Sequence, residues 1–435
     1  MNFIIIILPI TIILYITIWH IDVKKSLIIS PIIIFEMFMI FGIYTGYSAY
    51  KTNITNNLNS LFINLIAFIS TYLGFVLSDI RFIKSKRLIE FRNNYIQKFN
   101  HKKYLKIYLI LVIFLLAIGI YVYNGFPPIL NNIKQLIFGT LSDASALDAS
   151  YQRYLLTKSY YFGENYRGQG LIRIFLKFGY SYLIIISYVN FREKKNKSWI
   201  VLFIISAILS LAFVAGDGTR GPILRVFMAL LISSSIYKKE KISNLINILL
   251  IMLLIVIIIS MTSTKMFFQS KESGNIILSS ISSIMNRLLT GNQINDVYVI
   301  EFLKSGVLKY SFGKFHLVQF INQFPGVSSY KSFSYELSQL YGSGSGTTYM
   351  SPTYLSLAYT DFGIIGVILI YSLMGIIINY VSIKIFIKEK NSINISYLSL
   401  IILEMGLLPI TGPIAIIPSI IVIYFYYALL KIFIK

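Results

Sequence analysis

The sequence contains no cysteine and only three histidines, two tryptophans and 17 acidic residues. The lack of cysteine excludes disulfides, thiolate metal sites and cysteine nucleophiles. Charged residues make up 13% of the 435 residues, against about 25% in an ordinary soluble domain. This composition excludes a soluble enzyme with a conventional core. No P-loop and no dinucleotide-binding glycine motif occurs, which argues against a nucleotide site and against an ATP-driven transporter acting alone.

Long apolar runs dominate what is present. The chain is 56% hydrophobic with a mean hydropathy of +0.72, and a membrane span needs about 20 apolar residues. The runs predict an all-α, polytopic integral membrane protein with about eleven spans, forming a single transmembrane domain over residues 1–435. We treat the first run as an uncleaved span, because no small-residue cleavage site follows it. The runs are 2–19, 27–46, 59–80, 104–123, 169–189, 199–215, 222–236, 244–262, 351–375, 395–409 and 411–431. The last two runs are short, and a single broken hairpin around residues 408–413 is the alternative to two spans.

Basic residues outnumber acidic ones by 39 to 17, giving a net charge of +22. They gather in short segments between the runs, so we interpret the charge as a signal of membrane orientation and not of nucleic-acid binding. Alternation of eleven spans puts all these segments on one side, which the positive-inside rule makes cytoplasmic. We therefore expect the N-terminus outside and the C-terminus inside. The basic segments are Lys24-Lys25, 81–103, 192–197, 238–241 and 384–390.

Two long segments then lie outside the cytoplasm, a first extracytoplasmic loop at 124–168 and a large one at 263–350. The large loop has apolar residues at helical spacing within 276–288 and within 297–308. Such helices either lie on the membrane face or pack against each other above the bundle. The outer segments have no Asp-x-Asp pair and no histidine cluster, so we expect neither a metal site nor a cofactor.

The segment Gly216-Asp217-Gly218-Thr219-Arg220-Gly221-Pro222 predicts a tight outer turn before a helix. The glycines permit positive φ, and proline suits a first helical turn. Free N–H groups at the helix start, beside Arg220, favour an anion such as phosphate. Arg225 follows inside the span, where an arginine usually faces the bundle interior or a wet cavity. The alternative is that Arg220 only reaches lipid headgroups.

Further polar residues are candidates for binding or proton transfer, each with a structural alternative. Arg167 and Arg173 flank the start of the fifth run, and Arg287 lies on an amphipathic stretch. Asp361 lies below the outer surface of its span, where a helix-packing polar contact explains it. The intramembrane carboxylates Glu36 and Glu404 need partners or water. The candidate general bases are His316, Asp217, Glu301 and Glu336.

These features together resemble the Wzy-type oligosaccharide repeat-unit polymerases, relatives of the O-antigen ligases. The resemblance rests on Gly218-Thr219-Arg220-Gly221-Pro222, the late outer loop with Arg287, the segment Ser351-Pro352-Thr353-Tyr354-Leu355, and the element from Tyr359 to Gly366. Arg220 and Leu224 also fit the Arg-x-x-x-Leu pattern of the ligases. The sequence departs from the ligases at Ser351, where they carry a histidine. This departure favours polymerase over ligase and leaves the general base unassigned.

The resemblance implies a membrane glycosyltransferase (GT-C-like) architecture and a metal-independent reaction in the bacterial inner membrane. A glycan on polyprenyl pyrophosphate is the implied donor, a lipid-linked repeat unit is the acceptor, and the product is an O-antigen, capsule or related polysaccharide. A chain-length regulator and a flippase are the implied protein partners. We assign catalysis to Arg220, Arg287, Glu336 and His316. Pyrophosphate or glycan binding is assigned to Arg167, Arg173, Arg220, Arg225, Arg287 and Asp217.

Three other functions compete with polymerase. A flippase or secondary transporter of lipid-linked sugars shares the basic cavity and the intramembrane charges, although it more often has two related halves. A ligase moves the finished glycan to another acceptor. A structural or assembly membrane protein is the third.

Overall fold

In a computed structural model of the chain, most of the described residues lie in helices. In the residues that it describes the regular structure is α-helical, and no strand occurs there, in agreement with the predicted all-α class. The described residues are 31–51, 58–78, 90–91, 93–94, 96, 101–123, 127, 130, 169–194, 196–214, 220–237, 293–324, 331–340, 352–385 and 389–434.

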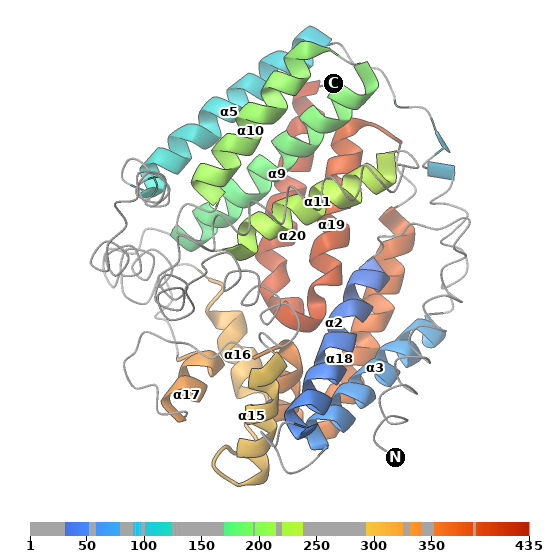
Figure 1. Cartoon of the computed structure of the whole chain (residues 1–435), viewed down its shortest axis with the longest axis vertical. Helices are drawn as coiled ribbons and strands as arrows, with labels where there is room; N and C mark the ends of the chain where they lie inside the picture. The colour runs from blue at the N-terminus through green and yellow to red at the C-terminus, as the bar shows by residue number, and fades with distance from the viewer. Residues whose placement is uncertain are drawn as a thin grey trace, which may run out of the picture. The chain divides into compact units, whose positions relative to one another are not determined.

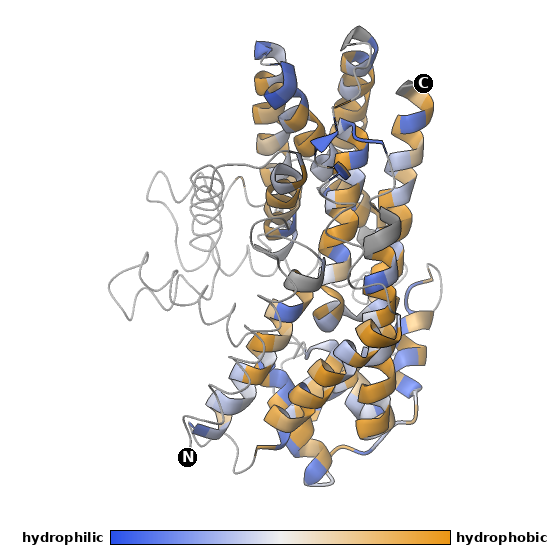
Figure 2. Cartoon of the chain, turned by 90° about the vertical axis from the view of Figure 1, so that its right-hand side faces the viewer, coloured by the Kyte–Doolittle hydropathy of each residue, from blue (hydrophilic) through white to orange (hydrophobic). Residues whose placement is uncertain are grey.

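Six helices in this part of the chain are long and apolar enough to cross a membrane, as their colouring in Figure 2 illustrates. Their apolar segments are 59–77, 103–123, 171–194, 197–214, 354–381 and 408–433, and shorter apolar helices cover 221–237 and 392–406. Every predicted run within the described residues coincides with a helix. Three predicted runs, 27–46, 222–236 and 395–409, fall on helices that are not among these six. The runs 2–19 and 244–262 lie outside the described residues, so the total of eleven stays a prediction.

The helices divide between two compact units that interleave along the chain. Unit 1 is drawn from residues 1–91, 285–388 and 404–417, and unit 2 from 92–284, 389–403 and 418–435. Each unit is compact by itself, and the prediction of one transmembrane domain stays a prediction.

Unit 1 is built on three helices that lie side by side, α2, α3 and α18 (Figure 1). Helices α3 and α18 cross at glycines: a Cβ on Gly74 would lie 2.0 Å from the Ser372 carbonyl oxygen, and one on Gly375 would lie 2.3 Å from that of Thr71. Such close backbone approach is the usual way that membrane helices associate, because lipid gives them no hydrophobic drive. The helices of unit 1 are α2 (Pro31–Lys51), α3 (Asn59–Leu77), α15 (Gln293–Lys304), α16 (Lys314–Ile321), α17 (Phe333–Leu340), α18 (Tyr354–Ile385) and the start of α20 (Leu408–Ile434).

The short helix α15 buries its apolar side against α2, α3 and α18. Val297, Val299 and Ile300 are all fully buried there. The helix predicted within 297–308 is thus confirmed as far as Lys304, and it packs on the long helices of unit 1, whereas Leu308 lies beyond its end. The other amphipathic stretch, 276–288, lies outside the described residues.

Unit 2 contains α5 (His101–Tyr123), α9 (Gln169–Lys194), α10 (Lys197–Val214), α11 (Arg220–Tyr237), most of α19 (Ser392–Gly406) and the rest of α20. Tyrosine hydroxyls join its helices by donating to main-chain carbonyls. Tyr182 donates to Ile423 over 2.9 Å and Tyr426 to Phe175 over 3.1 Å, both between α9 and α20. A phenol in an apolar interior needs such a partner, so many of the 33 tyrosines serve helix packing.

The basic ends of the unit 2 helices lie at one end of that unit. At the start of α5, Tyr104 bonds Ser392 of α19 over 3.0 Å, and its ring contacts Trp199 at the start of α10. Tyr237 at the end of α11 donates to Glu193 at the end of α9. The ends so joined carry Lys103, Arg192, Lys194, Lys197 and Lys390. This grouping agrees with the predicted alternation for these helices.

Two helices of unit 1 are broken at glycines in positive φ. Helix α18 has φ 64° and ψ −156° at Gly363, and α20 has φ 76° and ψ 161° at Gly412. These conformations suit glycine because a Cβ strains them. The second break was predicted as a broken hairpin around residues 408–413, although the structure has the break inside α20 and a turn at Leu407. A non-helical residue frees carbonyls of the preceding turn, and in an apolar setting these need new donors.

Sidedness is testable because the chain has no cysteine of its own. We expect Gly221→Cys to react from outside intact cells with a membrane-impermeant maleimide, and Ser198→Cys to react only after lysis. Both positions are exposed, and a Cβ on Gly221 meets nothing within 4 Å, so neither change should disturb folding. Labelling of Ser198→Cys in intact cells would reverse the predicted orientation.

Candidate functional site

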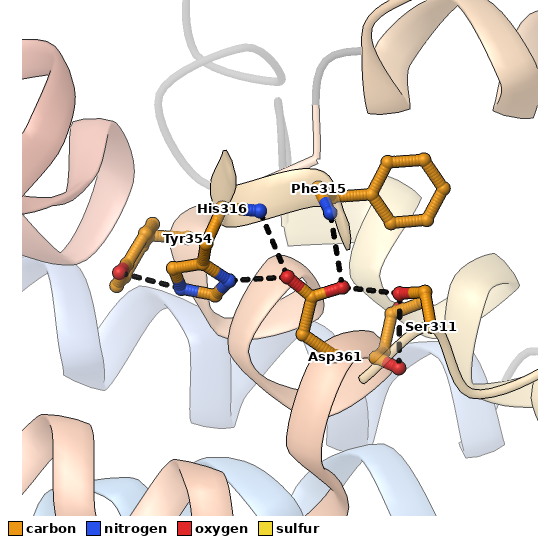
Figure 3. Close-up of polar contacts among 6 residues, drawn as sticks. Ser311, Phe315, His316, Tyr354 and Asp361 are labelled. Atoms are coloured by element: carbon orange, nitrogen blue, oxygen red, sulfur yellow. Dashed lines mark hydrogen bonds and ion pairs between the residues drawn. The ribbon is translucent and has the colours of Figure 1, made fainter. Parts of the chain in front are cut away.

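The carboxylate of Asp361, buried in α18, holds the start of α16. Its Oδ2 accepts from the His316 main-chain N–H over 2.9 Å, and its Oδ1 accepts from that of Phe315 over 3.3 Å (Figure 3). The N-cap of α16 is Gly313, which has no side chain to supply such an acceptor. Asp361 therefore caps the N-terminus of α16 from another helix, in place of an N-cap side chain. Its negative charge also complements the positive end of the helix dipole.

His316 lies between two partners from α18. Its Nδ1 bonds the Asp361 carboxylate, and its Nε2 lies 2.7 Å from the Tyr354 hydroxyl (Figure 3). A carboxylate accepts only from a protonated nitrogen, so Asp361 fixes the proton of neutral His316 on Nδ1. Nε2 is then the basic nitrogen, and the Tyr354 hydroxyl donates to it. This is the carboxylate–imidazole arrangement of a positioned general base.

The break at Gly363 contributes to the same network. The main-chain N–H of Ser311 donates to the Thr360 carbonyl over 3.0 Å, and the Ser311 hydroxyl donates to Asp361. A carbonyl in the turn before the break thus receives its donor from the segment leading to α16. The next residue, Phe312, has φ 48° and is 86% exposed. A bulky residue rarely adopts positive φ, and such strain persists where neighbours over-determine the backbone.

An open, largely apolar groove of about 550 Å³ runs from this network along α18. Beyond the break at Gly363 the groove is lined by two exposed apolar side chains, Ile365 (71% exposed) and Leu369 (65% exposed). Asp361 lines its polar end. The groove residues are Tyr310, Phe312, Asp361, Phe362, Gly363, Ile365, Gly366, Leu369 and Ile370.

Glu336, a second predicted catalytic residue, lies on α17 and pairs with Lys314 of α16 over 3.0 Å. Both side chains are partly exposed. Lys314 and His316 are both on α16, two residues apart. Two predicted candidates, Glu336 and His316, are therefore both associated with this helix. Glu301 lies on α15. Of the intramembrane carboxylates, Glu36 is buried and accepts from Tyr72 of α3, and Glu404 is buried in α19.

The described arginine candidates belong to unit 2. Helices α9 and α11 run parallel, since Tyr188 bonds Ser234 near their ends. Their starts therefore share the end of unit 2 opposite the basic ends. Arg173 and Arg225 lie near those starts and are half-buried. Helix α11 begins at Arg220, two residues before the predicted run, but the Arg220 side chain lies outside the described residues, as do Arg167, Asp217 and Arg287.

Sequence reasoning missed the partners of His316. Asp361 was interpreted as a helix-packing contact, Tyr354 was noted only as part of the segment 351–355 and given no role, and Ser311 was not singled out. The separations of 45 residues to Asp361 and 38 to Tyr354 explain this, because no local spacing links them. The one available signal was an aspartate two residues before a glycine inside an apolar run, since a buried charge needs specific donors.

Comparisons of the chain with protein-family models, with curated proteins and with solved structures found no match. Within the described residues, no three His, Asp or Glu side chains are grouped so as to hold a metal ion. Neither a relative nor a fold neighbour therefore identifies a ligand for the His316 network.

We expect Asp361→Asn to lower stability strongly. The amide keeps the shape of the side chain, but it removes the charge and turns an NH₂ donor toward groups that are themselves donors. A hydrogen bond to a charged acceptor contributes about 1.5–3 kcal/mol, and each buried donor left without a partner costs about 1–3 kcal/mol. The measurement is thermal unfolding of the purified protein in detergent. Glu336→Gln is the matched control, because a partly exposed pair contributes about 1 kcal/mol or less. Equal unfolding temperatures for Asp361→Asn and wild type would contradict this role.

Proposed function

We propose that the chain is a membrane glycosyltransferase that polymerises lipid-linked oligosaccharide repeat units, without a metal, at the extracytoplasmic face. The observation that carries the proposal is the groove along α18, which ends at an oriented histidine–aspartate pair. An enzyme that acts on a sugar attached to a membrane lipid needs this combination. It requires an apolar path for the chain and a proton acceptor where the headgroup begins.

In this proposal the polyprenyl chain lies along Ile365 and Leu369. The groove is on a helix long enough to cross the membrane, so a lipid reaches it sideways from the bilayer. A Cβ on Gly366 would lie 2.2 Å from the Phe362 Cβ, so this glycine makes room for the Phe362 side chain that lines the groove. Phe312 and Phe362 line the groove together with Asp361. The sugar–phosphate head then lies beside Asp361 and His316.

His316 takes up the proton of the attacking hydroxyl. The acceptor oxygen bonds to the anomeric carbon as the bond from that carbon to pyrophosphate breaks, and the electron pair leaves with pyrophosphate. Because Tyr354 occupies Nε2, the proton passes through the phenol: Tyr354 gives its proton to Nε2 and receives one from the acceptor. The Asp361 carboxylate stabilises the imidazolium that forms. Burial of Tyr354 keeps bulk water from competing.

The departing pyrophosphate needs positive charge. Arginine binds phosphate oxygens bidentately and stays charged at any physiological pH. We retain Arg220 and Arg287 for this role, with Arg167, Arg173, Arg225 and Asp217 as further binding residues.

The two candidate bases can be separated by substitution. We expect His316→Gln to reduce chain growth by about 10²-fold or more, the usual contribution of a positioned general base. Glu336→Gln should change it little, because the pair with Lys314 is at the surface. The measurement is the glycan ladder from cells lacking the native protein and carrying each variant at matched membrane levels. The reverse pattern would transfer the base role to Glu336.

The arginine roles predict a second pattern. Arg220→Ala and Arg287→Ala should stop chain growth at unchanged protein level and leave single repeat units on the lipid carrier. Arg220→Lys should restore growth only in part, because lysine lacks the planar fork. Full-length ladders in Arg220→Ala cells would contradict a pyrophosphate site at the turn 216–222.

A flippase for the same lipid-linked sugars is the second candidate. It is favoured by the two broken helices, since α20 breaks at Gly412 against the Tyr354 ring and α18 breaks two residues after Asp361. Discontinuous helices beside a polar site occur in secondary transporters. Proteoliposomes loaded with lipid-linked repeat units separate the two functions. A polymerase lengthens the glycan and releases polyprenyl pyrophosphate, whereas a flippase moves the unit between leaflets without lengthening it.

A further inference from the structure

A second buried polar site lies in unit 1, apart from His316. It is a small cavity of about 10 Å³, just large enough for one particle of the size of water. Five helices contribute to it, α2, α3, α15, α18 and the start of α20. Its polar lining comes from Asn64, Gln293, Asp296, Thr353 and Tyr371, all of them buried.

Asp296 of α15 is the charged group of this site. Its Oδ1 accepts from the Thr353 main-chain N–H (2.8 Å) and from the Ser356 hydroxyl (2.5 Å). Its Oδ2 accepts from the Thr353 hydroxyl (2.7 Å). A carboxylate has about four acceptor positions. Three donors therefore leave one position on Asp296 for something else.

The rest of the cavity offers oxygens and no positive charge. The side chains that line it include no lysine, arginine or histidine, and within the described residues no such group pairs with Asp296. Tyr371 is fully buried, and its hydroxyl oxygen has no hydrogen-bond partner. Asn64 and Gln293 supply amide oxygens. An ionised carboxylate in such surroundings is costly unless a cation or a proton neutralises it.

We propose that this cavity is a binding site for one monovalent cation of the size of sodium, held by Asp296, the Thr353 and Tyr371 hydroxyls and the amide oxygens. The single carboxylate and the small volume argue against calcium, which usually takes six to eight oxygens with several carboxylates. Pro409 and Ile410 also line the cavity, and Ile410 is two residues before the Gly412 break. The site stands independently of the glycosyltransferase proposal.

The site has a structural consequence for α18. The Thr353 hydroxyl accepts from the Leu355 N–H over 3.3 Å and so caps that helix. Tyr354, the partner of His316, lies between these two residues. A cation on Asp296 and Thr353 would therefore fix the start of the helix that carries Tyr354 and Asp361.

Protons compete for the same carboxylate. Burial raises the pKa of Asp296 to about 7, although its three hydrogen bonds oppose the rise. Of the residues lining the cavity, Asp296 and Tyr371 are the two that titrate. A raised folded-state pKa means that, without a cation, stability is highest below about pH 4 and falls as pH rises through 7. A cation that needs the ionised carboxylate should reverse this fall above pH 7.

The experiment is thermal unfolding of the full-length protein in detergent at pH 8, in chloride salts of sodium, potassium or choline at equal ionic strength. We expect sodium alone to raise the midpoint by at least about 2 °C, since it binds only the folded state. Asp296→Asn and Tyr371→Phe should abolish or reduce this rise. Asn59→Ala is the matched control on α3, outside the cavity, and should keep it.

Direct binding covers the case in which Asp296→Asn does not fold. Wild-type protein should bind ²²Na⁺ with a stoichiometry near one, displaced by protons below pH 7 and poorly by potassium. Equal midpoints in all three salts, with no bound ²²Na⁺, would overturn the proposal. If the midpoint then falls between pH 4 and 7 in a manner lost in Asp296→Asn, the site binds a proton only. If pH does not change the unfolding midpoint either, Asp296 has only a structural role. Glycan synthesis is not a readout, so failure of the glycosyltransferase proposal leaves this test intact.

Discussion

The polar end of unit 1 depends on one carboxylate. Asp361 receives hydrogens from two main-chain N–H groups, an imidazole and a hydroxyl, which together satisfy all its acceptor positions. These four bonds fix where α16 begins, which His316 nitrogen carries the proton, and how the chain leaves Ser311. An isolated charge at this depth of an apolar bundle is unfavourable, so the surrounding donors and the charge require each other. The strained backbone at Phe312 is a further consequence of this arrangement.

The helices were largely predictable and the site was not, for a physical reason. A span is a local property, because about 20 neighbouring residues decide whether it partitions into lipid. Helices α9 and α10, which end and begin within 192–197, were predicted from such local runs. Asp361 and His316, by contrast, are joined by packing across 45 residues, and Asp296 reaches Thr353 across 57. No periodicity encodes such a pair. The Gly412 break was foreseen because glycine and proline are local signals, but its contact with the Tyr354 ring was not.

The two polar sites of unit 1 share a design. Each has an aspartate that accepts main-chain N–H groups at the start of a helix, Asp361 at α16 and Asp296 just before α18. Each thereby converts a buried charge into a helix cap. They differ in the acceptor position that remains: Asp361 is saturated by protein donors, whereas Asp296 has one position left beside a cavity. Asp361 is therefore suited to fix the positions of its donors, and Asp296 is suited to bind an ion.

The crossing of α3 and α18 has a consequence for biosynthesis. The Ser372 hydroxyl donates to the Ser70 carbonyl over 3.0 Å, across 302 residues of sequence. At ribosomal speeds of about 5–20 residues per second, α3 waits roughly 15 to 60 s for its partner. During that interval the buried Ser70 and Thr71 of α3 have no α18 to cover them. The early helices of unit 1 must therefore remain in the membrane as an incomplete bundle, dependent on lipid or on the insertion machinery, until the last third of the chain has been made.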